Sequence, residues 1–179
     1  MKQSASPSQT GTTTAGWLWG AYSWLGLWAA VLTFVADQGH KWWMIHVYEI
    51  AKRGRVYVTP FLDLIYVINK GVSYGLLNNT GPWLLTSFAV ATSLALWVWL
   101  ARAGTSWAMG LGLGLIIGGA LANAVDRIVL GGVADFFSAH AFGYYWYVFN
   151  IADVAIVAGV IALLYDALWV SRNDASNAA

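Results

Sequence analysis

The chain of 179 residues is 59% hydrophobic and 9% charged, with a mean hydropathy of +0.61, whereas a soluble domain carries about 25% charged residues. This composition indicates a single-domain protein that crosses a membrane several times, and a net charge of +1 gives no electrostatic case for nucleic-acid binding. The absence of cysteine excludes disulfides and thiolate chemistry, and the absence of an HExxH motif argues against a zinc protease.

Residues 1–16 are small and polar, which is typical of a disordered tail. The apolar run that follows is too long for a signal peptide and has no A-x-A cleavage site after it, so we interpret it as a retained membrane helix. In all, four segments approach the roughly 20 apolar residues that cross a bilayer. They are Trp17–Val35, Pro82–Ala101, Ser106–Val125 and Ile151–Val170.

The third segment is rich in glycine, which allows neighbouring helices to approach closely. A very short link at residues 102–105 joins it to the second segment and predicts an antiparallel helical hairpin.

The region between the first two segments, residues 37–79, is more polar. Asp37 and Lys41 are spaced i, i+4, so they are expected to continue the first helix. Arg55–Thr59 and Leu62–Asn69 are rich in Val, Ile, Tyr and Phe, which predicts two short strands. With four spans, this region and the loop at 126–150 share one membrane face, where we expect a small sheet to rest on the surface.

The distribution of Lys and Arg does not settle the orientation of the chain in the membrane. The positive-inside rule places the N-terminus outside, because the loops on the opposite side carry more Lys and Arg. Lys41, Lys70 and Arg127 are also candidate site residues, and Lys52–Arg55 could bind lipid headgroups. The charge count by itself therefore leaves the orientation open.

Two aspartates stand at the edges of apolar stretches, Asp135 in GGVADFF and Asp153 in FNIADVAIV. Carboxylates in such places are costly and mark functional sites by default. Asn150 lies three residues before Asp153, which predicts a helix N-cap with the aspartate in the first turn. Two carboxylates that meet can share one proton and hydrolyse a peptide bond with water.

Structural interpretations compete at each polar position. Asp153 alone could complement the helix dipole, Asn123 could bond a neighbouring helix, and Asp166 falls at the opposite interface. Asp37 with Lys41, and Asp126 with Arg127, could each be a charged pair that only fixes a helix end.

Five blocks occur in order: DQGHK at 37–41, NKGVSYG at 69–75, GGALANAVDR at 118–127, GGVADFF at 131–137 and FNIAD at 149–153. Together they resemble the lipoprotein signal peptidases (signal peptidase II), bacterial aspartyl proteases of the inner membrane. The resemblance covers nearly all of residues 17–170. It implies a mainly α membrane protein with four transmembrane helices and a small extracytoplasmic β-cradle between the first two.

The same resemblance implies a domain at 17–171, made up of the helices, the cradle at 37–79 and a catalytic loop at 126–150. Both termini, with tails at 1–16 and 172–179, would be cytoplasmic, and the active site would face the other side of the inner membrane. The implied substrates are diacylglyceryl-modified prolipoproteins, cut just before the lipidated cysteine. Membrane phospholipids are the other expected partners, the chain is expected to be monomeric, and no metal or cofactor is expected.

The resemblance places the catalytic pair at Asp135 and Asp153. Asp153 is assigned as the general base, because a helix N-terminus favours a carboxylate. The supporting and substrate-binding positions would be Asp37, Lys41, Asn69, Gly71, Asn123, Arg127 and Asn150.

Two other functions remain open at this point. A membrane transporter or proton relay would use the same aspartates, but it predicts carboxylates spread through the membrane depth rather than gathered at one interface. A lipid-binding scaffold would use the basic cluster at 52–55, and it predicts that substitution of both aspartates is tolerated.

Overall fold

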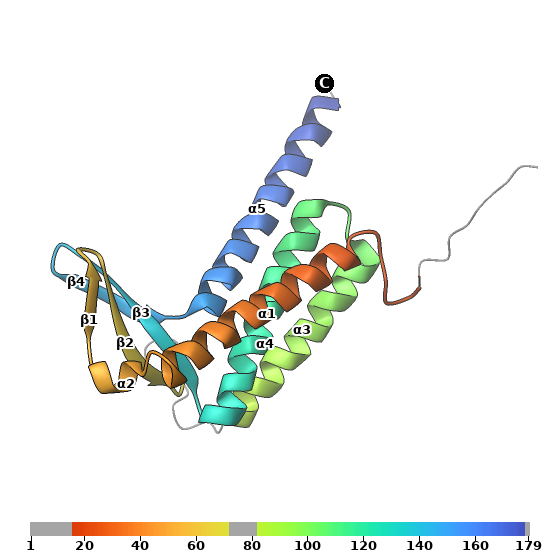
Figure 1. Ribbon diagram of the computed structural model, residues 1–179. Coiled ribbons are helices and arrows are strands. Elements are labelled where there is room, and N and C mark those ends of the chain that lie inside the picture. Colours follow the sequence, from red (N-terminus) through yellow and green to blue (C-terminus); the bar gives the residue numbers. More distant parts are fainter. Residues whose placement is uncertain (1–15, 72–81, 178–179) are drawn as a thin grey trace, which may run out of the picture.

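The computed structural model describes residues 16–71 and 82–177. Its helices form a bundle, and a four-stranded sheet extends from one end of the bundle (Figure 1). Helix α4 lies at the centre and packs against α1, α3 and α5. The elements in chain order are α1 (Ser23–His46), α2 (Ile50–Arg53), β1 (Val56–Thr59), β2 (Leu62–Asn69), α3 (Pro82–Ala103), α4 (Trp107–Leu130), β3 (Val133–Ala141), β4 (Tyr144–Phe149) and α5 (Ile151–Asn177).

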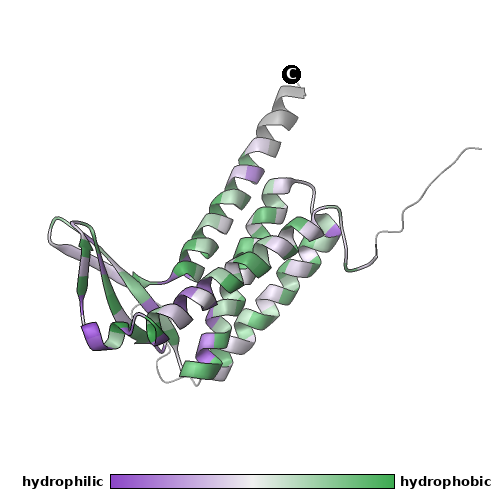
Figure 2. Ribbon diagram, in the orientation of Figure 1, coloured by the Kyte–Doolittle hydropathy of each residue, from purple (hydrophilic) through white to green (hydrophobic). Residues whose placement is uncertain are grey.

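Within the described ranges, three helices are long and apolar enough to cross a membrane: Trp83–Ala103, Trp107–Leu130 and Ile151–Trp169. The expected first span, Trp17–Val35, is not among them. Its helix begins only at Ser23 and becomes polar from Asp37 onward, so the uncharged part is short. Figure 2 shows hydrophilic residues concentrated where the helices adjoin the sheet.

Other boundaries also differ from the expectation. The third predicted segment continues to Leu130 and ends at Gly131, whose φ of 72° suits glycine. The last helix continues through Asn177, so the expected tail from 172 is helical over most of its length. The expected tail at 1–15 and the turn after Gly71 lie outside the described residues.

Small residues let α4 approach its neighbours closely, as predicted. A Cβ added at Gly114 would lie 2.4 Å from the carbonyl oxygen of Gly26 on α1. A Cβ at Gly119 would lie 2.6 Å from the carbonyl oxygen of Ala152 on α5. These backbone contacts leave no room for a side chain at either position.

We therefore expect Gly114→Ala to destabilise the protein by about 1–3 kcal/mol, because the new methyl group forces α1 and α4 apart. The matched control is Gly39→Ala on α1, where an added Cβ meets nothing within 4 Å. That change should be neutral or stabilising, by up to about 1 kcal/mol. Thermal unfolding of both variants in lipid tests the comparison, and equal effects would contradict close contact at Gly114.

The sheet joins two hairpins from distant parts of the chain, in the order β1-β2-β3-β4 with antiparallel neighbours. The two strands predicted before residue 70 are confirmed. The region at 126–150 is not a loop, because after α4 it forms β3 and β4. Pairing of β2 with β3 sets Val67 opposite Asp135. The two regions therefore do lie on one side of the helices.

Apolar packing fixes this sheet to the end of α1. Phe136 of β3 is fully buried and packs in one cluster with Met44 of α1, Ile50 of α2 and Ala134. The neighbour of Phe136 in sequence is Asp135, so the same strand carries a core side chain on one face and a candidate catalytic group on the other.

A buried carboxylate ties the two hairpins together. Asp63 of β2 accepts a hydrogen bond from Arg55 (2.9 Å) and contacts His140 Nε2 of β3 at 3.1 Å. Burial raises the pKa of Asp63, but the hydrogen bonds with Arg55 and His140 and the positive charge of Arg55 outweigh it and leave this pKa below its ordinary value. The group therefore stays ionised as the sheet forms around it.

Candidate active site

The two candidate catalytic aspartates line one cavity at the junction of the sheet and the helices. Asp135 comes from β3 and is 2% exposed, whereas Asp153 comes from the first turn of α5 and is half-buried. The cavity has a volume of about 230 Å³. It is lined by Asn69, Gly71, Asn123, Arg127, Val133, Asp135, Tyr147, Val148, Asp153, Ile156 and Val157.

Asn150 connects the two aspartates. Its side-chain amide donates to Asp135 Oδ1 at 2.7 Å, while its backbone N–H donates to Asp153 Oδ2 at 3.1 Å. In return, the backbone N–H of Asp153 donates to Asn150 Oδ1 at 3.0 Å. This reciprocal arrangement is the predicted cap of α5, and it also sets the position of one carboxylate relative to the other.

Two further asparagines complete the contacts of the pair. Asn123 of α4 donates to Asp153 Oδ1 at 3.0 Å, and Asn69 at the end of β2 donates to Asp135 Oδ2 at 3.3 Å. The backbone N–H of Gly71 donates to Asn69 Oδ1 at 3.2 Å and orients that amide. Each of the four carboxylate oxygens of the two aspartates thus accepts a hydrogen bond from an amide.

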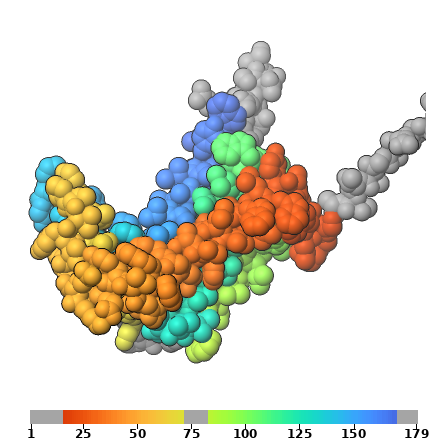
Figure 3. All heavy atoms as spheres, viewed as in Figure 1, coloured from red at the N-terminus to blue at the C-terminus, as the bar shows by residue number. Residues whose placement is uncertain are grey.

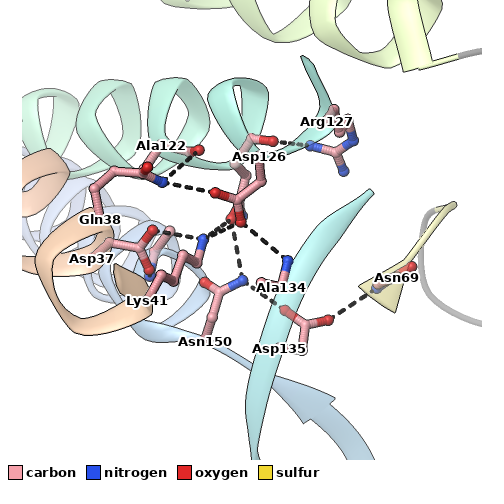
Figure 4. Close-up of polar contacts among 12 residues, drawn as sticks. Asp37, Gln38, Lys41, Asn69, Ala122, Asp126, Arg127, Ala134, Asp135 and Asn150 are labelled. Atoms are coloured by element: carbon pink, nitrogen blue, oxygen red, sulfur yellow. Dashed lines mark hydrogen bonds and ion pairs between the residues drawn. The ribbon is translucent and has the colours of Figure 1, made fainter. Parts of the chain in front are cut away.

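Beneath the pair lies a buried ionic cluster centred on Lys41 of α1 (Figure 4). Lys41 Nζ lies 2.6 Å from a carboxylate oxygen of Asp37 and 2.6 Å from one of Asp126, and it donates to Asn123 Oδ1 at 3.0 Å. Gln38 adds a hydrogen bond of 2.8 Å to Asp126. The cluster therefore joins α1 to α4 and holds the amide that contacts Asp153.

The same cluster fixes the backbone just before each catalytic candidate. Asp126 accepts a hydrogen bond from the N–H of Ala134 (3.1 Å), and Asp37 accepts one from the N–H of Ala152 (2.9 Å). Ala134 precedes Asp135 and Ala152 precedes Asp153. One buried cluster thus positions both the strand and the helix that carry the pair.

Asp126 and Gln38 are members of this site that the sequence interpretation did not include. The expected pair of Asp126 with Arg127 does not form, since Asp126 pairs with Lys41 and Arg127 Nη1 donates to the carbonyl of Asn123 at 3.0 Å. The available signal was an aspartate inside an apolar helix, which needs a buried cationic partner.

Arg127 retains unused hydrogen-bonding capacity beside the cavity. The residue lines the cavity, and its buried Nε has no hydrogen-bond partner within the described part of the chain. A buried donor without a partner is costly. A carbonyl oxygen of a bound peptide could satisfy it.

The surroundings of Asp135 favour its protonated form. Burial, and then the negative charge of Asp153, raise its pKa to about 7, against the opposing hydrogen bonds from Asn150 and Asn69 and the charge of Lys41. Close carboxylates cannot both ionise easily. Near neutral pH, Asp135 can therefore hold a proton beside a second carboxylate, which is the arrangement needed for acid–base chemistry.

Asp166 lies at the other end of α5, where it accepts a hydrogen bond from the hydroxyl of Ser106. Ser106 in turn caps α4 by accepting from the N–H of Met109. This contact agrees with the structural interpretation of Asp166.

Comparison with known proteins gives consistent matches. The model of the family described as Signal peptidase (SPase) II matches residues 29–169. A lipoprotein signal peptidase of Rhodopseudomonas palustris (strain ATCC BAA-98 / CGA009) is 49% identical over 151 residues, which cover 80% of this chain and 92% of that protein. Another, from Methylobacterium sp. (strain 4-46), is 47% identical over 156 residues, covering 85% and 94%.

The fold is also similar to a solved structure of a bacterial membrane enzyme. The TM-score is 0.73 at 27% identity, over 83% of this chain and 90% of that one. The family match spans both candidate aspartates and the residues that contact them. The chain therefore belongs to the signal peptidase II family.

Proposed function

We propose that this protein is an aspartic endopeptidase that removes signal peptides from diacylglyceryl-modified prolipoproteins by cutting just before the lipidated cysteine. The observation that carries the proposal is the pair of aspartates in one cavity, with the pKa of Asp135 raised to about 7 beside Asp153. The relatives bear the name lipoprotein signal peptidase, which supports this substrate class.

In this mechanism Asp153 is ionised and removes a proton from a water molecule, which attacks the scissile carbonyl carbon. Asp135 is protonated and polarises the carbonyl oxygen. The tetrahedral intermediate then collapses, the C–N bond breaks and the leaving nitrogen receives a proton from the pair. Asp153 suits the role of base because it lies at a helix N-terminus and accepts from the Asn150 backbone N–H.

The supporting residues fall into two groups. Asn69, Gly71, Asn123 and Arg127 line the cavity, so we assign them to binding the substrate backbone and orienting the pair. Asp37, Lys41 and Asn150 lie beneath it and are assigned to positioning, since their contacts hold the strand and helix that bear the aspartates.

For the arrangement in the membrane, we propose that α1 is a fourth span beside α3, α4 and α5. Both termini would then lie on one side, which we assign to the cytoplasm from the family resemblance, and the sheet with the cavity would lie at the outer face of the bacterial inner membrane. The domain would run from 17 to 171 and act as a monomer among phospholipids. The gathering of the buried carboxylates at one end of the bundle supports a site at one interface rather than a relay through the membrane.

The test of this function is cleavage of a synthetic lipobox peptide by purified protein in lipid. The wild type should cut a diacylglyceryl-modified peptide, and the product masses should place the cut just before the modified cysteine. The unmodified peptide is the control and should remain intact. If folded protein in lipid never cuts the modified peptide, the peptidase proposal fails and a binding or transport function is favoured instead.

The activity should also depend on pH through Asp135. Because the protonated form is the required acid and its pKa is about 7, kcat/KM should fall about tenfold per pH unit as pH rises above about 7. The measurement is initial cleavage rates from pH 5 to 9 at low substrate concentration. A rate that keeps rising to pH 9 would contradict a protonated Asp135.

A further inference from the structure

A second pocket adjoins the catalytic cavity, in the angle between β4 and α5. Tyr147, Phe149, Asp153, Val154 and Val157 line it, and its volume is about 230 Å³. We call it the β4–α5 pocket. In Figure 3 the surface is hollowed between the sheet and α5.

The two spaces share a wall but differ in chemistry. Tyr147, Asp153 and Val157 line both of them. The catalytic cavity has side-chain amides, a guanidinium and a second carboxylate beside its apolar residues, whereas the β4–α5 pocket has Asp153 as its one carboxylate among apolar and aromatic side chains. The β4–α5 pocket therefore suits an apolar group better than the catalytic cavity does.

The pocket also opens toward the surrounding lipid. Val154 and Val157 are 53% and 55% exposed, and they lie on a helix whose apolar stretch is mostly unburied within the protein. Hydrocarbon can therefore pass between this pocket and the membrane. The pocket volume of about 230 Å³ is smaller than a single turn of a helix about 10–12 Å wide, so the pocket suits a narrow alkyl chain and not a helix.

The proposed substrate, on which this step depends, supplies such a chain at the required place. The cysteine sulfur that bears the diacylglyceryl group is three bonds from the scissile nitrogen. The lipid is therefore attached to the peptide directly beside the pair of aspartates. A larger apolar pocket between α1, α3 and α4 shares no lining residue with the catalytic cavity. The geometry thus points to the β4–α5 pocket as the site that receives the acyl chains of the diacylglyceryl group, a contact that would make the enzyme selective for lipidated substrates.

Val154→Trp tests the assignment, because Val154 lines the β4–α5 pocket and is absent from the lining of the catalytic cavity. The indole should fill the pocket and raise KM for a dipalmitoylglyceryl lipobox peptide about tenfold or more, which corresponds to the lost burial of about two methylene groups. The value of kcat should stay within about threefold. KM for the diacetylglyceryl peptide should change by less than about threefold, since its chains barely enter the pocket.

The matched control is Ile161→Trp, which adds the same ring at an exposed position of α5 outside the pocket. This variant should change KM for each of the two peptides by less than about twofold. Equal losses for both peptides in Val154→Trp, or no loss for either, would overturn the assignment. If the wild type cut neither peptide, the proposed function itself would fail, and this assignment with it.

Photolabelling gives an answer even if Val154→Trp does not fold. A substrate with a diazirine near the carboxyl end of one acyl chain should label β4 and the first turns of α5 in the wild type. Labelling confined to the helices of the larger apolar pocket, such as α3, would overturn the assignment.

Discussion

Asp135→Asn and Asp153→Asn should each lower kcat for the diacylglyceryl lipobox peptide by about 10²–10⁴-fold, the usual contribution of a positioned acid or base. Asparagine keeps the shape of the side chain but cannot accept or deliver the proton. Substrate binding should change little, because the residues assigned to the peptide backbone, such as Arg127, remain. Single-turnover cleavage in lipid measures the effect.

The matched control is Asp166→Asn, which changes an aspartate on the same helix as Asp153 but at its far end. That variant should keep at least half of the wild-type rate. Near-normal cleavage by either Asp135→Asn or Asp153→Asn would remove that residue from the mechanism.

The pH dependence of stability tests the raised pKa of Asp135. The pKa of Asp135 is raised from 3.8 to about 7 in the folded protein, so its stabilising effect is complete below about pH 4 and is lost as pH rises toward about 7. Asparagine does not titrate. As pH rises over this range, the Tm of Asp135→Asn should therefore increase relative to that of the wild type. Parallel plots of Tm against pH for the two proteins would contradict the raised pKa.

Lys41→Met should lower the free energy of unfolding by about 3–5 kcal/mol. The change leaves the carboxylates of Asp37 and Asp126 buried without their shared cation, and breaking a buried ion pair from one side has a cost of this size. Thermal or denaturant unfolding in detergent measures it. Activity should fall as well, because Lys41 also holds Asn123.

The surface pair Glu49–Lys52 is the matched control. Both side chains are substantially exposed, at 49% and 74%, so Lys52→Met should cost less than about 1 kcal/mol. A second test adds Asp37→Asn and Asp126→Asn to Lys41→Met, which should recover part of the lost stability by removing the unpaired charges. A triple variant no more stable than Lys41→Met would contradict the ionic explanation.

Much of the architecture follows from local sequence signals. Pro82 and Asn150 mark where α3 and α5 begin, and Gly131 ends α4, because each suits the backbone required at its position. The composition of Leu62–Asn69 likewise predicted β2 with its observed bounds. These features depend on neighbours in sequence, which a single sequence contains.

The second hairpin was not predicted, because β3 and β4 lie in a region interpreted as a loop. Asp135 lies in β3, whose pairing with β2 joins residues far apart in the chain. The aromatic run of β4 could have served as a strand signal. The loop interpretation thus included the candidate Asp135 but not the sheet that holds it.

The candidate site residues were placed by the resemblance that the five sequence blocks carry, but the contacts among them were not predicted. Asp126 was interpreted as the partner of Arg127, its neighbour in sequence, whereas in the fold it pairs with Lys41 on another helix. Which cation a buried carboxylate meets is decided by helix packing. That choice becomes visible only when α1 and α4 are placed side by side.

The most direct test of the proposed mechanism is a structure of Asp135→Asn with an intact diacylglyceryl lipobox peptide in lipid. The mechanism predicts that the scissile carbonyl lies beside Asn at position 135 and Asp153, with a water within about 3.5 Å of its carbon, a productive attack distance. A peptide bound with its scissile bond away from both residues would contradict the central claim that this pair performs the hydrolysis.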